Sequence, residues 1–151
     1  MTDIRILRLE RDGRKPDLPR FATAGAAAAD LSAFLEAPVT IQPGQRFGVP
    51  TGIALELPEG WCAFVMARSG LSLKSGIGLA NGVGLIDSDY RGEVRVSLQN
   101  NGDQPFTVED GMRVAQLLFL PVPAIQLVEA EALSETERGS GGFGSTGFRK
   151  L

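Results

Sequence analysis

The hydrophobic residues of this chain fall in short runs of mixed apolar and polar positions, and each run is bounded by Gly, Pro, Asn or Asp. Short runs of this kind, ended by turn-forming residues, are typical of β-strands. We expect strands at residues 4–9, 39–41, 53–57, 61–66, 94–99, 113–120 and 125–128. The pattern predicts one short helical turn, at residues 69–74.

The even spacing of these runs predicts an all-β fold. The chain has 19 glycines and nine prolines, and short strands separated by so many turn residues favour a sandwich, jelly roll or barrel. With 151 residues it is long enough for one domain with its own core. No repeat or linker divides it, so we expect one all-β domain over residues 1–137 and a flexible Gly-rich arm over residues 138–151.

The composition limits the chemistry that is available. The chain contains no histidine and a single cysteine, Cys62. It therefore has no imidazole base and no Ser-His-Asp triad, it can form no internal disulfide, and a zinc ion would find only carboxylate ligands. If the protein is hydrolytic, we expect Asp or Glu as the base, and any metal should be a hard ion such as magnesium.

The charge of the chain restricts its partners. A formal net charge of −3 argues against a nucleic-acid polymer. No apolar run is long enough to span a membrane, and the first nine residues carry Asp3, Arg5 and Arg8 in place of a signal-peptide core. We expect a cytoplasmic protein whose ligand, if it carries phosphate, is small.

Residues 138–147 are half glycine. Glycine lets successive backbone N–H groups face one anion, and the Arg138 guanidinium would fit phosphate oxygens. The composition alone also fits a disordered Gly/Ser terminus. A plain linker, however, does not need Arg138, Phe143 or Thr146. An arm that closes over a ligand is therefore kept as the second interpretation of this segment.

Glycines also flank a segment at residues 82–94, which we interpret as a hairpin with its bend at residues 87–91. Asp87 and Asp89 could simply be turn formers. They could bind magnesium together only if they shared one face, and a bend between them breaks that geometry.

Three further positions are weak signals when each is taken alone. Arg68-Ser69-Gly70 follows a strand and starts the helical turn, so it would suit a phosphate group or would equally be a serine cap beside an exposed arginine. Asp30 could be a turn former, and Gln116 could be the polar side of a strand.

Taken in order, these segments resemble the five motifs of the homotrimeric dUTPase family. The matching segments are residues 25–31, 67–71, 81–94, 113–117 and 138–147. The third and fifth motifs are the most specific. Ala28, Ala29 and Ala67 depart from the usual residues of the first two motifs, but they remove no side chain that does chemistry.

The resemblance implies a β-clip, or distorted jelly-roll, fold assembled as a homotrimer with shared active sites. It implies a dUTP diphosphatase, which hydrolyses dUTP to dUMP and diphosphate by attack of water on the α-phosphorus. Mg²⁺ would be bound mainly by the substrate phosphates. This activity limits uracil incorporation into DNA and supplies dUMP for thymidylate synthesis.

The same resemblance assigns roles to individual residues. Asp87 would orient and deprotonate the water, Tyr90 would pack under the deoxyribose and exclude a 2′-hydroxyl, and Asp30 would hold a water on the magnesium. Near the uracil the other substrate-binding residues would be Asn81, Leu85, Ile86 and Arg95. At the phosphates they would be Arg68, Ser69, Gly70 and Gln116. In the arm they would be Arg138, Phe143, Gly144, Ser145 and Thr146, with Phe143 stacked over the uracil.

Two other functions remain open on the sequence. A dCTP deaminase of the same fold would release ammonia, but the tyrosine-bearing segment and the complete arm favour dUTPase. A non-catalytic jelly-roll binding or assembly protein would be expected to lack Asp87, Tyr90 or the arm, and all three are present.

Overall fold

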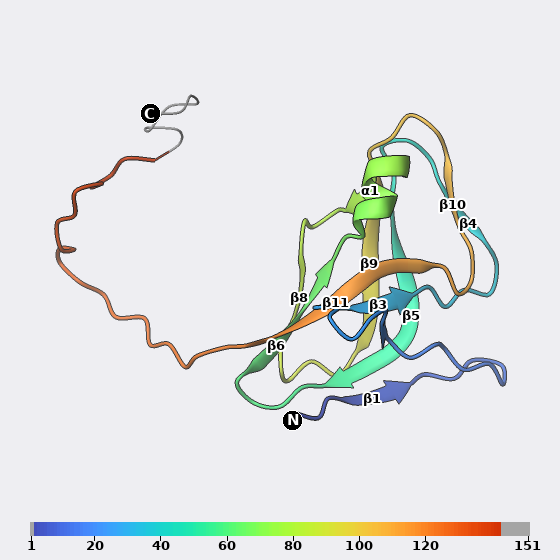
Figure 1. Cartoon of the computed structure of the whole chain (residues 1–151), viewed down its shortest axis with the longest axis horizontal. Coiled ribbons are helices and arrows are strands. Elements are labelled where there is room, and N and C mark those ends of the chain that lie inside the picture. Colours follow the sequence, from blue (N-terminus) through green and yellow to red (C-terminus); the bar gives the residue numbers. More distant parts are fainter. Residues whose placement is uncertain (1, 143–151) are drawn as a thin grey trace.

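Glycine and proline turns divide the chain into short strands, and one helix interrupts them (Figure 1). The computed structural model describes residues 2–142. Its elements, in chain order, are β1 (Arg5–Arg8), β2 (Arg20–Phe21), β3 (Ala29–Ser32), β4 (Val39–Ile41), β5 (Arg46–Glu56), β6 (Trp61–Met66), α1 (Ser69–Ser75), β7 (Ile77–Leu79), β8 (Gly84–Ile86), β9 (Glu93–Asn100), β10 (Phe106–Val108) and β11 (Arg113–Pro121).

The strands form three antiparallel sheets. One has four strands in the order β1-β5-β9-β7, one has five in the order β2-β3-β11-β6-β8, and β10 pairs with β4. Alternation within the strands explains why the sheets bury one face. In β9, for example, Val94, Val96 and Leu98 are buried and Arg95 is exposed. The predicted all-β class with one short helix is confirmed.

The main hydrophobic core unites residues of the two larger sheets. Ile53 and Leu55 of β5 belong to the same buried cluster as Val65 of β6 and Leu117 of β11. Burial of side chains from both sheets fixes the position of each sheet relative to the other, and with it the loops that run from one sheet to the other.

The predicted elements are confirmed where the local sequence pattern agrees with the strand pairing of the structure. Residues 61–66 form β6, and the predicted helical turn is α1. The strand expected at residues 125–128 is wrong, because that segment is extended without any ladder partner. The sequence prediction also missed β2, β3, β7 and β10, which have two to four residues each.

The hairpin predicted at residues 82–94 is also wrong in its pairing. β8 pairs with β6, whereas β9 pairs with β5 and β7, so the two arms belong to different sheets. The turn residues were correctly recognised, but each arm is held by a strand remote in sequence. The segment is a crossover that runs along the opening between the two sheets.

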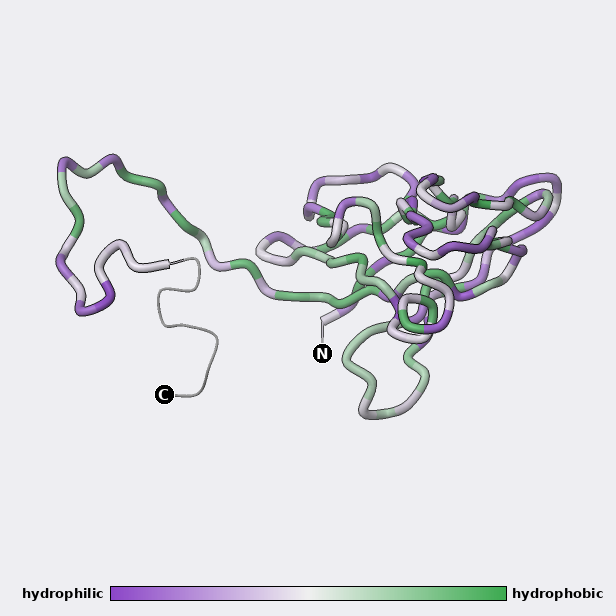
Figure 2. Tube along the Cα trace, turned by 90° about the horizontal axis from the view of Figure 1, so that it is seen from above, coloured by the Kyte–Doolittle hydropathy of each residue, from purple (hydrophilic) through white to green (hydrophobic). Residues whose placement is uncertain are grey.

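Beyond β11 the chain leaves the sheets (Figures 1 and 2). Residues 122–140 are exposed, although they include several large hydrophobic side chains. Within residues 2–142, no helix has the length and apolar character needed to cross a membrane.

Candidate active site

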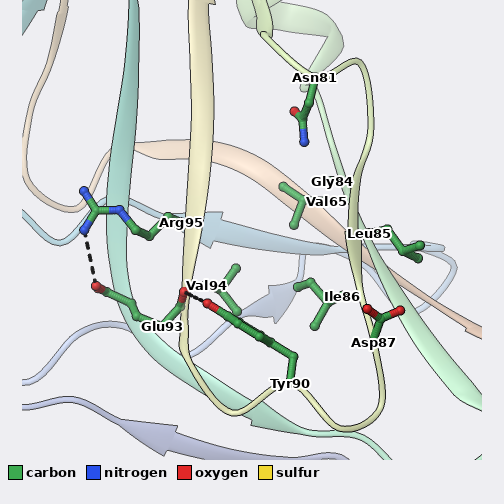
Figure 3. Close-up of a pocket in the computed structure, with 10 residues that line it drawn as sticks. All are labelled: Val65, Asn81, Gly84, Leu85, Ile86, Asp87, Tyr90, Glu93, Val94 and Arg95. Atoms are coloured by element: carbon green, nitrogen blue, oxygen red, sulfur yellow. Dashed lines mark hydrogen bonds and ion pairs between the residues drawn. The ribbon is translucent and has the colours of Figure 1, made fainter.

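A cavity of about 250 Å³ opens between the two larger sheets beside the β8–β9 crossover. Its lining residues are Val65, Asn81, Gly84, Leu85, Ile86, Asp87, Tyr90, Glu93, Val94 and Arg95 (Figure 3). The structure thus brings together six of the residues that the sequence analysis assigned to the nucleoside and the water: Asn81, Leu85, Ile86, Asp87, Tyr90 and Arg95.

Strand β8 supplies one wall of the cavity. Ile86 is buried at 6% exposure and anchors the strand, while the neighbouring Leu85 is 61% exposed, as the alternation of a strand requires. β8 is also the edge strand of its sheet. One side of its backbone therefore has N–H and C=O groups free to bind a planar polar ligand.

The close approach of Val65 favours a glycine in β8. A Cβ placed on Gly84 would lie 3.0 Å from the Val65 Cβ and 3.6 Å from Asn81 Nδ2. Asn81 lies at one end of the cavity, and Tyr90 and Asp87 lie at the other (Figure 3). The cavity combines an apolar wall with polar groups at its ends, a combination that suits a flat heterocycle joined to a sugar.

Tyr90 is held at two points although its side chain is 46% exposed. Its hydroxyl donates to the Glu93 carbonyl oxygen at 3.1 Å. Its ring lies so close to Gly92 that a Cβ there would be 2.6 Å from the Tyr90 Cζ. The main chain of Gly92 and Glu93 therefore restrains the position of this ring.

Asp87 begins the crossover immediately after β8, and its backbone carbonyl accepts a hydrogen bond from the Tyr90 N–H at 3.2 Å. The residue is exposed, so its carboxylate is accessible to water. On the far side of the cavity Arg95 donates to the Gly48 carbonyl at 2.8 Å, and its Nη1 lies 3.8 Å from Glu93 Oε2 (Figure 3).

A second cluster combines the residues predicted to bind phosphate. Asp30 Oδ1 lies 3.2 Å from Arg68 Nε, and Asp30 Oδ2 lies 2.8 Å from Arg113 Nη1. Gln116 is level with Asp30 on β3 and with Met66 on β6, and it donates to the Ala67 carbonyl at 3.1 Å. Two guanidiniums share one carboxylate, so the cluster keeps an excess positive charge.

Arg113 is a member of this cluster that the sequence analysis did not single out. Its place within the fourth motif was the signal available in the sequence. The structure places it at the start of β11, beside Arg68 and Asp30. Arg68 donates to the Arg113 carbonyl at 3.0 Å. The alternative of an exposed arginine beside a serine cap does not fit, because Arg68 is paired and no side chain caps α1. Ser69 and Gly70 form the first turn of the helix and are exposed.

The phosphate cluster and Asp87 lie toward opposite ends of β6. Ile86 pairs with Ala63, so Asp87 is level with Cys62, whereas Arg68 extends β6 beyond Met66. The backbone at Arg68 is still extended, at φ −89° and ψ 126°. At about 3.3 Å per residue the two positions are on the order of 20 Å apart.

Among the named arm residues the structure describes only Arg138, and it does not bring this residue to either cluster. Arg138 is exposed, and its Nε donates to the Gly141 carbonyl at 2.8 Å. Phe143, Gly144, Ser145 and Thr146 lie outside the described residues.

The carboxylates of the described chain do not form a metal cage. Within residues 2–142, no three or more Asp, Glu or Cys side chains are grouped so that they could hold an ion. Mg²⁺ usually keeps several waters and takes one or two carboxylates plus substrate phosphates. Asp30 has a guanidinium on each oxygen, yet a carboxylate retains further lone pairs for a water. The donor set fits magnesium that arrives on phosphate oxygens.

Comparisons with known proteins agree with this arrangement. A family model described as dUTPase matches residues 14–147. The deoxyuridine 5'-triphosphate nucleotidohydrolase of Desulfitobacterium hafniense (strain DSM 10664 / DCB-2) is 54% identical over 91% of this chain and 91% of its own length.

Solved structures give the same fold. The dUTPase of Staphylococcus bacteriophage 80alpha with dUPNHPP superposes with a TM-score of 0.87 over 98% of this chain and 100% of its own, at 23% identity. A variant of the dUTPase from phage phi11 of S. aureus, described with a coordinated structural Mg(II) ion, has a TM-score of 0.76 over 87% of this chain and 98% of its own, at 20% identity.

Proposed function

The chain belongs to the dUTPase family, and on this premise we propose how it hydrolyses dUTP to dUMP and diphosphate. The observation that carries the proposal is the cavity between the sheets, where a fixed tyrosine ring and an exposed carboxylate meet beside an unpaired strand edge. By this activity the protein would limit uracil incorporation into DNA and supply dUMP for thymidylate synthesis. With a single cysteine, Cys62, the chain can form no internal disulfide, and on this ground we propose a cytoplasmic location.

The uracil and deoxyribose occupy the cavity. The free backbone edge of β8 hydrogen-bonds the uracil, with Asn81 at one end and Arg95 opposite. Leu85 and Ile86 provide the apolar wall that crowds a 5-methyl group. Tyr90 packs under the deoxyribose, and because the main chain fixes its ring, the ring cannot yield to a 2′-hydroxyl.

Asp87 is the general base. Its carboxylate lies at the end of the cavity beside Tyr90, where it would accept a proton from the water that attacks the α-phosphorus. A positioned carboxylate of this kind contributes about 10²- to 10⁴-fold to a rate. Most of the remaining acceleration comes from aligning the water with the leaving diphosphate and from stabilising charge on the phosphate oxygens.

The phosphates are bound by the second cluster, from another subunit. Arg68, Ser69, Gly70 and Gln116 lie too far along β6 to contact a phosphate beside Asp87 of the same chain. A neighbouring subunit therefore has to supply them, and we propose a homotrimer with shared sites. The exposed apolar side chains of Val122, Ile125, Leu127, Val128 and Leu133 support assembly, because they cover no core in the single chain.

Magnesium enters this scheme on the triphosphate, where it neutralises phosphate charge. Asp30 would hold one of its waters while keeping Arg68 and Arg113 in place. The arm, with Arg138, Phe143, Gly144, Ser145 and Thr146, would close over the uracil and the terminal phosphate.

A substrate panel tests the proposal. We expect diphosphate release from dUTP with magnesium to exceed release from dTTP, dCTP and UTP by orders of magnitude, and no ammonia to form. Ammonia from dCTP would favour the deaminase instead, and equal rates on all four nucleotides would refute the proposed specificity.

A further inference from the structure

We infer that the ion pair between Arg11 and Glu93, of which only Glu93 lines the cavity, positions Tyr90 and thereby sets the preference for deoxyribose over ribose. Arg11 lies outside all five motifs, and it does not line the cavity. The inference rests on the function proposed above, in which Tyr90 excludes the 2′-hydroxyl. It assigns Arg11 and the carboxylate of Glu93 as positioning groups, since their contacts are with protein.

Glu93 is anchored in an irregularity of the four-stranded sheet. The register of β5 against β9 shifts between the pairs Pro50↔Arg95 and Ala54↔Glu93. The Gly52 N–H, inside this shift, donates to Glu93 Oε1 at 2.8 Å. Gly52 has φ +68°, and a Cβ there would lie 2.7 Å from the Pro16 Cβ, so only glycine fits the bulge.

Arg11 completes this anchor from the N-terminal part of the chain. Its Nη2 donates to the same Glu93 Oε1 at 2.7 Å, and the Glu93 side chain is only 15% exposed. The guanidinium is itself held in place, because its carbon lies 5.3 Å from the centre of the Phe34 ring. A partly buried, charge-assisted hydrogen bond between two such fixed groups is among the stronger polar contacts in proteins.

The anchored residue is also the one that holds the tyrosine. The Glu93 carbonyl oxygen accepts the Tyr90 hydroxyl at 3.1 Å. Glu93 is the first residue of β9 and is paired with Ala54 of β5, next to the register shift, so its side-chain contacts add restraint at this end of the strand. Rotation of Glu93 would move this carbonyl, the adjoining Gly92 and the Tyr90 ring together.

Burial cannot replace this restraint, since Tyr90 is 46% exposed. A ring that is free to shift would open space beside the sugar. Small displacements of this kind change rates strongly, by as much as about 10²-fold for a displacement near 1 Å. The expected consequence is selective: UTP gains relative to dUTP, because only UTP needs the extra space.

The test compares Arg11→Met with Arg14→Met. Arg14 belongs to the same turn, and its guanidinium carbon lies 5.1 Å from the same Phe34 ring, but it pairs with Asp110 instead of Glu93. The two variants therefore lose similar packing, and only the first loses the contact to Glu93. We would measure kcat and KM for dUTP and UTP, with circular dichroism and size-exclusion chromatography to compare their folding and assembly.

We expect Arg11→Met to raise the ratio of kcat/KM for UTP to that for dUTP by about fivefold or more, and Arg14→Met to leave the ratio unchanged. Glu93→Gln, which can still accept the Gly52 N–H, should shift the ratio in the same direction, and Arg11→Lys should restore part of it. In a Tyr90→Phe background Arg11→Met should add little, because the hydroxyl bond is already gone.

An unchanged ratio in folded Arg11→Met and Glu93→Gln would overturn the inference, as would an equal shift in Arg14→Met. If Arg11→Met does not fold, Glu93→Gln and Arg11→Lys decide the question. Failure of the proposed function has a different signature: the unmodified protein itself would show no preference for dUTP over UTP, and the inference would fall with it.

Discussion

The separation of Asp87 from the phosphate cluster predicts that two inactive variants restore activity when their subunits mix. In Asp87→Asn the general base is lost, and in Arg68→Ala a phosphate ligand is lost. If one subunit supplies the cavity and another supplies Arg68, a mixed trimer contains some sites with both residues intact. If one subunit supplies both, no mixed site is ever complete.

The structure gives the size of the effect. Asp87 and Arg68 are separated by on the order of 20 Å along β6, so we assign them to different subunits at each site. In a random one-to-one mixture, half the cavities carry Asp87 and half of their partners carry Arg68. About a quarter of all sites should therefore be complete.

The parent variants provide a low background. Loss of the base should reduce turnover by about 10²- to 10⁴-fold, and loss of one charge-stabilising donor by about 10²- to 10³-fold. Activity near a quarter of that of the unmodified protein would therefore stand well above the sum of the two parents.

The assay is diphosphate release after subunit exchange, with exchange verified by native mass spectrometry of differently tagged chains. A mixture of Asp87→Asn with Tyr90→Ala is the matched control, because both residues line the same cavity of one chain, and this mixture should stay inactive. Verified exchange without recovery in the Asp87→Asn and Arg68→Ala mixture would refute the shared site.

Three further predictions concern single positions. Gly92→Ala should lower kcat/KM for dUTP by about tenfold or more while the fold is kept, because the added Cβ would displace the Tyr90 ring. Diphosphate release by the folded variant measures this effect, and unchanged kinetics would contradict the two-point restraint of Tyr90. Asn100→Leu should destabilise the protein by about 3 kcal/mol or more in urea unfolding, since this buried amide bonds the Ile41 and Gln104 carbonyls and the N–H of a third residue, whereas Asn101→Leu at the exposed neighbour should change little. Deletion of residues 139–151 should abolish most turnover while the oligomer measured by light scattering persists, and full activity would show that the arm is not needed.

Local sequence signals were sufficient for some elements and not for others. β6 and α1 were predictable because the chain marks both of their ends with turn-forming residues. β3 was missed because it begins at the end of a run of four alanines and is a strand through its pairing with β2 and with β11, which follows more than eighty residues later. The crossover at residues 82–94 carries hairpin turn residues, and only tertiary pairing sends its arms to different sheets.

The candidate site shows the same limit. Motif matching found the side chains of the cavity and most of the phosphate cluster, because each motif is local. It could not show that Asp87 and the phosphate cluster lie toward opposite ends of one strand, which depends on the register of β6 with β8 and β11. Arg113 and the carboxylate of Glu93 were missed because their contacts, to Asp30 and Arg11, join residues far apart in sequence.

The phosphate cluster also explains why a carboxylate is placed among groups meant to bind an anion. Asp30 removes one unit of positive charge, which taken alone weakens phosphate binding. In return it holds Arg68 and Arg113 in defined positions before substrate arrives, and donors fixed in advance need no reorganisation as charge develops in the transition state. Without Asp30 the two guanidiniums would repel each other, and each would have to be ordered by the substrate itself. The carboxylate therefore contributes to phosphate binding through its arginines, in addition to any water that it holds on magnesium.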